Sequence, residues 1–354
     1  MEVTRRGFVR HCLVAGGVLT VYPPACARAG EGGGRPEGWK PAYAKLEEEG
    51  RFAERVEEAW ELLRECRLCP RGCGVNRLRG RRGICRAPAE VVVHSASPHF
   101  GEEIPLVGRH GSGTIFFSNC NLRCIFCQNW PIAHEGRGQT LREEDLAGVM
   151  LELQRLGCHN INVVTPTHVM PNILRATRLA LHRGLRIPLV YNTGGYEDPE
   201  IIRLLDGVVD IYLPDVKYTD GRQAAKYSAG AEDYPERAKA SVLEMHRQVG
   251  GLVTDDDGIA LRGVMIRHLV MPNRVAGTRE FVEWVARELP TDTYVNIMAQ
   301  YRVEYEAFNH SEIARAITPA EFLEAMDWAK EARLTRLDAR SESQWQIYRR
   351  RLRD

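Results

Sequence analysis

The stretch from Gly113 to Trp130, GTIFFSNCNLRCIFCQNW, contains the pattern around which the rest of the chain is organised. A run of β-forming residues, 114–117, leads into a loop that carries Cys120, Cys124 and Cys127 in a C-x3-C-x2-C spacing. Thiolates are soft ligands that suit zinc and iron–sulfur clusters, and three on one short loop can reach one metal centre. Because a closed structural zinc site normally takes four protein ligands, three cysteines predict a centre with one open position.

Size and composition exclude several classes of protein. The chain has 354 residues, of which 44% are hydrophobic, so it has room for one large domain with an appendage or for two domains. Its net charge of +1 gives no overall indication of a nucleic acid or an acidic lipid as a partner. No uninterrupted apolar run reaches the roughly 18 residues of a membrane-spanning helix, so we expect no membrane span.

Residues 1–29 resemble an export signal rather than part of a folded domain. Arg5 and Arg6 are followed by Phe8 and then by an apolar segment at 12–22, which is the order of regions in a twin-arginine signal. We therefore expect export by the twin-arginine route to a periplasmic or extracytoplasmic location. The alternative is a basic tail on a cytoplasmic protein.

A second group of cysteines follows a helix predicted at 41–63. Cys66, Cys69, Cys73 and Cys85 form a C-x2-C-x3-C-x11-C set, which can complete a zinc site, ligate a second cluster or form disulfides after export. The segment is rich in arginine and has no acidic residue between Cys66 and Arg86, which indicates either a solvated basic face or a surface for an acidic partner. Because no row of aromatic residues accompanies the arginines, we do not expect nucleic acid.

From Gly113 onward, predicted strands alternate with predicted helices, which is typical of a parallel α/β architecture. The six predicted strands lie at 114–118, 160–164, 188–191, 210–213, 263–270 and 294–298. Polar residues follow each of these strands, and in a barrel such residues meet at the carboxyl ends of the strands. The sequence therefore predicts one site at that end.

With Phe126 directly before its last cysteine, the loop resembles the signature of the radical S-adenosylmethionine (SAM) superfamily. Within it the chain is similar to the pyruvate formate-lyase activating enzyme-like group, in a branch with an extra N-terminal cysteine segment. The motifs that carry this likeness are CRLCPRGCGVN at 66–76, GSGTIFFS at 111–118 and NIMAQY at 296–301. The resemblance implies an α/β fold, a partial (β/α)6 TIM-like barrel with an N-terminal Cys-rich extension.

The residue patterns and the resemblance together predict a division of the chain. The expected parts are a signal at 1–29, a linker, helix and four-cysteine knuckle at 30–110, a radical SAM core at 111–310 and a C-terminal helical segment at 311–354.

The resemblance also implies the chemistry. Cys120, Cys124 and Cys127 would ligate a [4Fe-4S] cluster whose open iron binds SAM, and the reduced cluster would cleave SAM to a 5′-deoxyadenosyl radical that abstracts hydrogen. The expected partners are a flavodoxin- or ferredoxin-like one-electron reductant and a substrate of unknown identity, for example a protein. A glycyl-radical-enzyme activase or a protein or peptide modifier fits this description.

Several residues occupy the positions of SAM contacts in that family. Phe126 would lie near the adenine, Asn192 and Thr193 near the ribose, and Lys217 near the methionyl carboxylate. For each of the last three, an ordinary turn or surface role is the alternative.

One motif of the family is replaced in this chain. Where many relatives carry Gly-Gly-Glu after the second strand, this chain has Thr165-Pro-Thr167-His168. A hydroxyl or carbonyl of Thr165 or Thr167 would then accept the SAM ammonium hydrogen bonds without a carboxylate's charge. His168 would be a hydrogen-bond partner, a proton donor or a structural residue.

Two other functions compete with the radical enzyme. A non-catalytic iron–sulfur electron carrier or metal-binding module on the same scaffold is the alternative, but such a protein needs neither an incomplete ligand set nor polar strand ends. A zinc hydrolase is disfavoured because the sequence has no His-Glu-x-x-His motif.

Overall fold

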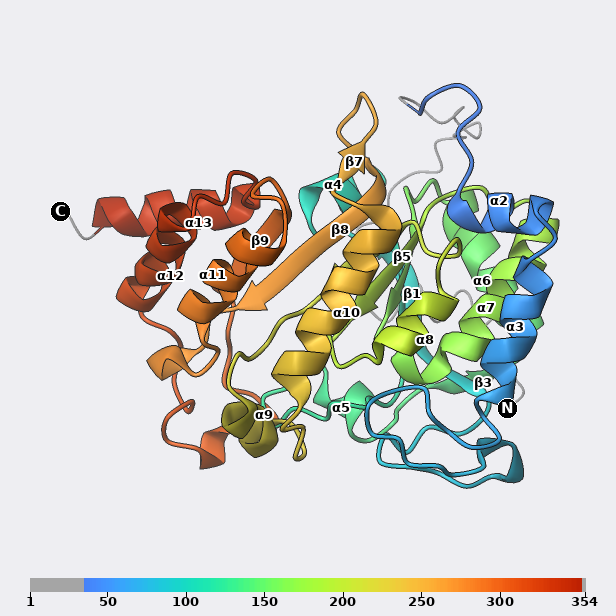
Figure 1. Ribbon diagram of the computed structural model, residues 1–354, viewed down its shortest axis with the longest axis horizontal. Coiled ribbons are helices and arrows are strands. Elements are labelled where there is room, and N and C mark those ends of the chain that lie inside the picture. The colour runs from blue at the N-terminus through green and yellow to red at the C-terminus, as the bar shows by residue number, and fades with distance from the viewer. Residues whose placement is uncertain (1–34, 352–354) are drawn as a thin grey trace, which may run out of the picture.

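The computed structural model describes residues 35–351, and its centre is a sheet that curves into an open barrel (Figure 1). Neighbouring strands along the barrel wall are parallel and follow one another in chain order, which confirms the predicted partial (β/α)6 barrel. These strands are β2 (Ser112–Phe117), β4 (Ile161–Val164), β5 (Leu189–Thr193), β6 (Ile211–Pro214), β8 (Ala260–Leu269) and β9 (Tyr294–Met298). The signal predicted at 1–29 lies outside the described residues.

Three further strands lie at the margins of the sheet. β1 (Val91–His99) pairs antiparallel with β2, β3 (Gln139–Leu141) pairs antiparallel with β1, and β7 (Val253–Thr254) pairs antiparallel with β8. Within residues 35–351, the strand ladder of β9 is with β8 and none joins it to β1 or β2, so the barrel wall is open on that side. β1 belongs by sequence to the predicted extension, yet it is part of the barrel sheet.

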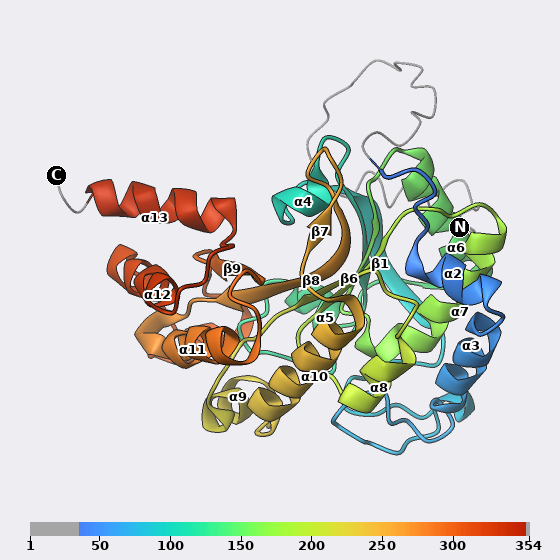
Figure 2. The same cartoon turned by 45° about the horizontal axis from the view of Figure 1, so that its top comes forward.

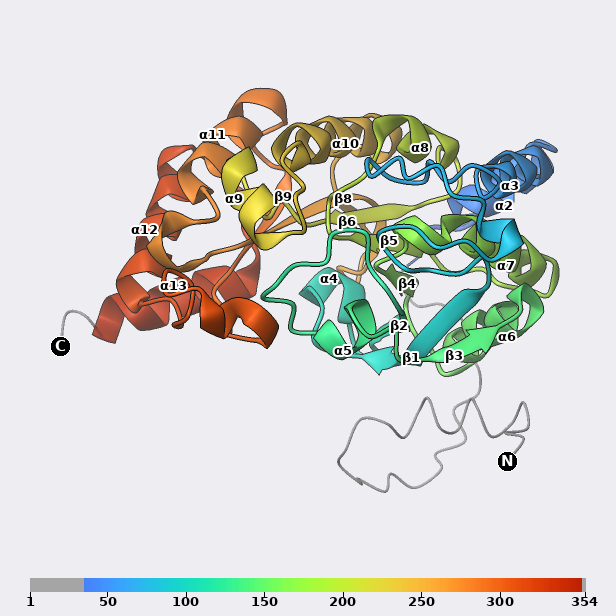
Figure 3. The same ribbon diagram turned by 90° about the horizontal axis from the view of Figure 1, so that it is seen from below.

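Helices cover the outside of the barrel (Figures 2 and 3). In β4, Ile161 and Val163 point outward into the main apolar core, whereas Asn162 between them points to the lumen, as the alternation of side chains along a strand requires. The helices that follow the strands are α6 (Glu143–Arg155), α7 (Met170–His182), α8 (Pro199–Leu204), α9 (Gly221–Tyr227), α10 (Tyr234–Val249), α11 (Thr278–Glu288), α12 (Pro319–Glu331) and α13 (Ala339–Arg351).

A small apolar cluster fills the amino-terminal end of the lumen. The short helix α4 (Ile104–Val107) contributes Leu106, which packs with Val190, Ile211 and Met265 from three strands and is fully buried. The lumen is therefore closed below by apolar contacts, and its polar residues lie above them, toward the carboxyl ends.

The N-terminal extension packs against α7. The single helix predicted at 41–63 is wrong in one respect, because the chain forms two helices, α2 (Ala42–Glu48) and α3 (Phe52–Glu61). Gly50 separates them with a φ of +75°, a left-handed conformation that ends α2. The remaining short helices are α5 (Trp130–Ala133), η1 (Arg77–Arg79), η2 (Thr167–Val169), η3 (Pro272–Arg274) and η4 (Tyr305–Asn309). Across the described residues, no helix is both long and apolar enough to cross a membrane.

Candidate active site

The loop with Cys120, Cys124 and Cys127 follows β2 directly, at the carboxyl end of the barrel. Asn121 fixes it to the loop after β5, because its Nδ2 donates a 2.7 Å hydrogen bond to the carbonyl of Tyr196. Phe126 is 5% exposed and packs against the rings of Tyr218 and Tyr301, with ring centroids 6.2 and 6.0 Å apart. The cysteine loop is thus embedded in an aromatic cluster at the end of the barrel.

Two loop sulfurs accept hydrogen bonds. The Ser228 hydroxyl donates to Cys124 Sγ at 3.1 Å, and the Leu122 N–H donates to Cys120 Sγ at 3.4 Å. Burial raises the pKa of Cys124 to about 11 and that of Cys127 to about 12, so metal ions have to displace the thiol protons. Hydrogen bonds to sulfur and a water-poor setting are typical of cluster ligands, so these residues fit an iron–sulfur cluster.

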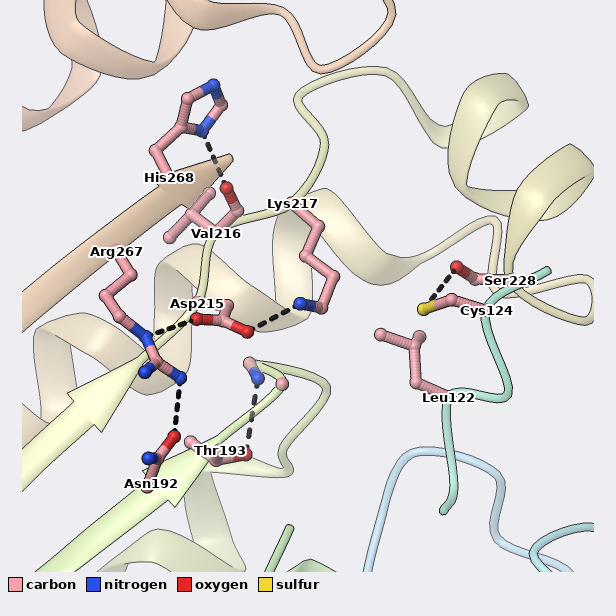
Figure 4. A network of polar contacts seen from close by, with 12 residues as sticks. Leu122, Cys124, Asn192, Thr193, Asp215, Val216, Lys217, Ser228, Arg267 and His268 are labelled. Carbon is pink, nitrogen blue, oxygen red and sulfur yellow. Dashed lines mark hydrogen bonds and ion pairs between the residues drawn. The ribbon is translucent and has the colours of Figure 1, made fainter. Parts of the chain in front are cut away.

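Lys217 projects from the end of β6 toward the cysteine loop (Figure 4). Its Nζ lies 2.5 Å from Asp215 Oδ2, and its positive charge lowers the pKa of Cys124 against the larger effect of burial. Asp215 also accepts a 2.7 Å hydrogen bond from Arg267 Nε on β8. Burial alone would raise the pKa of Asp215, but Arg267 and Lys217 hold it below its usual value, so the carboxylate stays ionised.

Asn192 belongs to the same network. Its Oδ1 accepts a 2.5 Å hydrogen bond from Arg267 Nη2. The turn after Asn192 requires glycine at position 195. Gly195 has a φ of +81°, and the Cβ of any other residue there would lie 2.0 Å from the carbonyl oxygen of Asp215. The structure therefore brings together Phe126, Asn192 and Lys217 of the predicted SAM residues around the cysteine loop.

The predicted threonines have different partners. The hydroxyls of Thr167 and Thr193 both donate to Glu197 Oε1, the former at 2.5 Å, and Glu197 is completely buried. Burial raises the pKa of Glu197 to about 7. Thr165 adopts a left-handed conformation with φ of +57°, and its N–H donates to the carbonyl of Asn192 at 2.9 Å. Thr167 and Thr193 thus link two strand-end loops through one carboxyl group.

His168 supports the start of the cysteine loop. Its Nε2 donates a 2.7 Å hydrogen bond to the carbonyl of Ser118, two residues before Cys120. Burial and the neighbouring Arg77 lower the pKa of His168 to about 4, so the ring is neutral at physiological pH. Of the three roles that the sequence allows, this geometry matches the structural one.

The four cysteines of the extension lie on irregular loops. Cys66 and Cys85 are buried, Cys69 and Cys73 are partly exposed, and all four thiols are free. Gly83 packs on Cys73, since a Cβ at this glycine would lie 2.4 Å from the sulfur. No three of these cysteines are grouped around one ion position in the described part of the chain, and a metal at this position stays a prediction.

Arg71 attaches this extension to the cysteine loop. Its guanidinium donates to the carbonyls of Asn121 at 3.0 Å, Ser228 at 3.0 Å and Ala229 at 2.8 Å. Asn121 lies in the loop, and Ser228 is the residue whose hydroxyl bonds Cys124. The two cysteine-rich regions are therefore neighbours, although about 50 residues separate them in sequence.

Sequence reasoning missed Arg71, Ser228 and Arg267. Arg267 carried a usable signal, because a charged residue that directly follows the apolar run 264–266 of strand β8 indicates a functional or paired position. Arg71 and Ser228 carried none, since loop arginines and serines are ordinary surface residues.

Comparison with known proteins finds a family profile and related chains. Residues 114–255 match the profile of the radical SAM superfamily. The chain is 32% identical over 289 residues to the uncharacterized protein MJ0674 of Methanocaldococcus jannaschii, which covers 79% of this chain and 78% of that protein. A structure of TYW1 with a lysine-pyruvate adduct bound aligns at a TM-score of 0.40 and 12% identity, covering 62% of this chain and 73% of that chain.

The profile match begins in β2 and includes the cysteine loop. Members of this family carry a [4Fe-4S] cluster, bind SAM and need a reductant. With its three-cysteine loop at the end of a partial barrel, this chain belongs to the radical SAM superfamily.

Proposed function

We propose that Cys120, Cys124 and Cys127 hold the [4Fe-4S] cluster and that this protein abstracts hydrogen from a substrate in the barrel lumen. The observation that carries the proposal is the position of the cysteine loop above the lumen, beside the buried cation Lys217 (Figure 4). When bound and reduced, the cluster supplies the electron that cleaves SAM to methionine and a 5′-deoxyadenosyl radical.

The chain's own residues position SAM and exclude water. Lys217, held by Asp215, would pair with the methionyl carboxylate, and Phe126 would border the adenine. Asn192 would contact the ribose through the second hydrogen of its Nδ2, since its Oδ1 accepts from Arg267 and its Nδ2 donates to Glu102 at 3.5 Å. Thr167 and Thr193 would act indirectly, by fixing the strand-end loops through Glu197.

The carbonyl oxygen of Thr165 would accept hydrogen bonds from the SAM ammonium group, in place of the Gly-Gly-Glu motif. Its left-handed backbone supports this role, because a strained conformation in a non-glycine residue is typical of functional loops. Within the superfamily, we infer an activase of a glycyl-radical enzyme or a modifier of proteins or peptides. The support for this narrower function is the set of motifs at 66–76, 111–118 and 296–301.

We further propose that Cys66, Cys69, Cys73 and Cys85 bind a second metal centre, either zinc or an auxiliary cluster. Four free thiols close to one another in a segment without strands support it, because a metal would supply the cross-links that secondary structure does not. Export of the folded, cofactor-loaded protein by the twin-arginine route is proposed from residues 1–29.

The reductant would dock on the arginines of this extension. Five of them are exposed, and none forms an ion pair within residues 35–351: Arg67, Arg79, Arg81, Arg82 and Arg86. Exposed arginines elsewhere, such as Arg142 and Arg274, pair with acidic neighbours. An uncompensated basic surface beside the cluster loop suits an acidic flavodoxin- or ferredoxin-like protein.

The deciding experiment is anaerobic reconstitution with iron and sulfide, followed by reduction and measurement of 5′-deoxyadenosine formed from SAM. The wild-type protein should form it, and Cys124→Ala should lose both the cluster absorbance and the product. Cys158→Ala is the matched control, because Cys158 is also buried but lies before β4, at the opposite end of that strand from the site. A reduced, fully loaded wild-type protein that yields no 5′-deoxyadenosine would leave the non-catalytic electron carrier as the function.

A further inference from the structure

A layer of polar side chains crosses the lumen between the apolar cluster around Leu106 and the cysteine loop. Glu102 and Glu103 enter it from the segment between β1 and α4, and both are at least nine-tenths buried. The barrel strands contribute Asn192, Arg267 and Asn296 to the same layer. None of these five residues belongs to the cysteine loop.

Two of the three carboxyl groups in this layer form ion pairs. Arg267 lies 3.2 Å from Glu102 and 2.7 Å from Asp215, and Lys217 pairs with Asp215 as well. Glu103 forms no ion pair among the described residues, and burial raises its pKa although the nearby charge of Arg267 opposes that rise.

Glu103 is bound on one side only. Its Oε1 accepts a 2.8 Å hydrogen bond from Asn296 Nδ2, whereas its Oε2 has no hydrogen-bond partner within residues 35–351. The side chain is 2% exposed and points into the lumen, because Asn296 lies between Val295 and Ile297, which both face the outer core. A buried carboxyl oxygen without a donor is costly, so a ligand that supplies one is stabilised there.

Four apolar side chains at the carboxyl ends of the barrel strands are only partly buried. Phe116, Val164, Leu269 and Met298 alternate with residues of the outer core, yet each keeps intermediate exposure. A packed barrel interior would bury them. The end that carries the cysteine loop is therefore the side from which a ligand would approach the polar layer.

We propose that Glu103 is the anchor for a primary ammonium group of the substrate, either a free amine or a lysine side chain. This deepens the proposed function, on which it rests, by naming the substrate class. An ammonium provides the missing donor, and its positive charge would keep the Glu103 carboxylate ionised against the effect of burial. Glu102 is already engaged by Arg267, which leaves Glu103 as the acceptor.

The test measures amine binding without turnover, in full-length protein with oxidised cluster and bound SAM. Saturation-transfer NMR would compare n-butylammonium with tetramethylammonium, which has charge but no N–H, and with n-butanol, which is neutral. We expect n-butylammonium to bind best and Glu103→Gln to weaken it roughly tenfold or more. Glu331→Gln, an exposed glutamate on α12, is the matched control and should bind like wild type.

A second arm distinguishes the two sources of the amine. A blocked tripeptide, acetyl-Gly-Lys-Gly-amide, should bind more tightly than n-butylammonium if the substrate is a protein lysine, and more weakly if it is a small amine. Equal binding of n-butylammonium to wild type and Glu103→Gln would overturn the proposal. Loss of n-butylammonium binding when potassium replaces choline in the buffer would also overturn it, because the site would then be one for an inorganic cation.

A wild-type crystal soaked with n-butylammonium keeps the proposal testable even where the variant fails to fold. The nitrogen should lie within hydrogen-bond distance of Glu103 Oε2, and a position elsewhere would contradict the assignment. Since 5′-deoxyadenosine formation is measured separately, the amine site can fail while the proposed radical chemistry stands, and the reverse also holds.

Discussion

The two cysteine-rich regions of this chain are neighbours in space but are built in different ways. The loop 120–127 continues a buried strand, and its sulfurs accept hydrogen bonds from Leu122 and Ser228. The extension around Cys66 to Cys85 has only one short helical turn, η1, and is attached to the barrel by arginine contacts to backbone carbonyls. The barrel therefore positions the first set of ligands, whereas the second set depends on Arg71, Arg77 and whatever its thiols bind.

The largest expected effect is the loss of metal from one cysteine-rich region while the other keeps its own. Cys120→Ala should remove the loop cluster and reduce 5′-deoxyadenosine formation to background, because the remaining two thiolates cannot hold a [4Fe-4S] centre. Metal analysis should still find any metal bound by the extension. Loss of both metals from this one variant would mean that the two regions share a single centre.

Cys69→Ala is the reciprocal change. It should abolish the second metal and lower thermal stability, because the extension loses a cross-link that its loops require. The loop cluster should keep its absorbance and its iron. Wild-type protein that contains only the loop iron and no other metal would disprove a second centre.

A buried acid between the regions should give the stability a pH dependence. Glu197 titrates near pH 7 when folded and near its usual 4.5 when unfolded, so the folded state binds more protons between these values. The free energy of unfolding should therefore fall as pH rises from about 4.5 to 7, by at most about 3 kcal/mol. Denaturant titrations of Glu197→Gln should lack this pH-dependent fall in the free energy of unfolding. The control Glu331→Gln should retain it.

Removing the contact between the regions should have a smaller effect. Arg71→Ala deletes the hydrogen bonds to three carbonyls, and we expect a loss of about 1–3 kcal/mol in the free energy of unfolding. Arg67→Ala removes an exposed arginine of the same segment and should change it by less than about 0.5 kcal/mol. Equal effects of the two variants would show that Arg71 does not hold the extension in place.

The smallest effect concerns electron delivery. The double variant Arg82→Glu/Arg86→Glu should cleave SAM several-fold more slowly than wild type when a flavodoxin is the electron donor, but at the wild-type rate when dithionite is the donor. Added salt should reduce this difference between variant and wild type. The matched control reverses Arg109 and Arg333, two exposed arginines outside the segment 66–86. An unchanged ratio of the two rates would place the reductant on another surface.

The sequence predicted the six barrel strands to within a few residues, because each is a short apolar run bounded by polar residues. It did not predict β1, whose nine residues include His94, three small residues and Pro98 and thus lack strong alternation. It also predicted one helix where Gly50 divides two, since apolar spacing continues across the break. Periodicity reports which face is buried but does not report where the backbone turns.

At the site, the cysteines were predictable because metal ligands have a characteristic spacing along the chain. The partners of those cysteines were not. Lys217 is buried beside Asp215 and Arg267 only because β6 and β8 are adjacent, and Thr193 bonds Glu197 rather than facing the loop. Hydrogen-bond direction depends on side-chain rotamers and on strand register, which no local pattern encodes.

The sequence by itself determined the parallel α/β class, the superfamily and the three cysteines of the loop, because periodicity and ligand spacing are local properties of the chain. Only the tertiary structure decided that Arg71 joins the two cysteine regions and that Arg267 lies between Glu102 and Asp215. It also left Glu103 Oε2 without a hydrogen-bond partner among residues 35–351. These contacts link residues up to 193 positions apart, as Asn296 and Glu103 illustrate. Such pairs form only when the barrel curves and brings distant strand ends around one lumen.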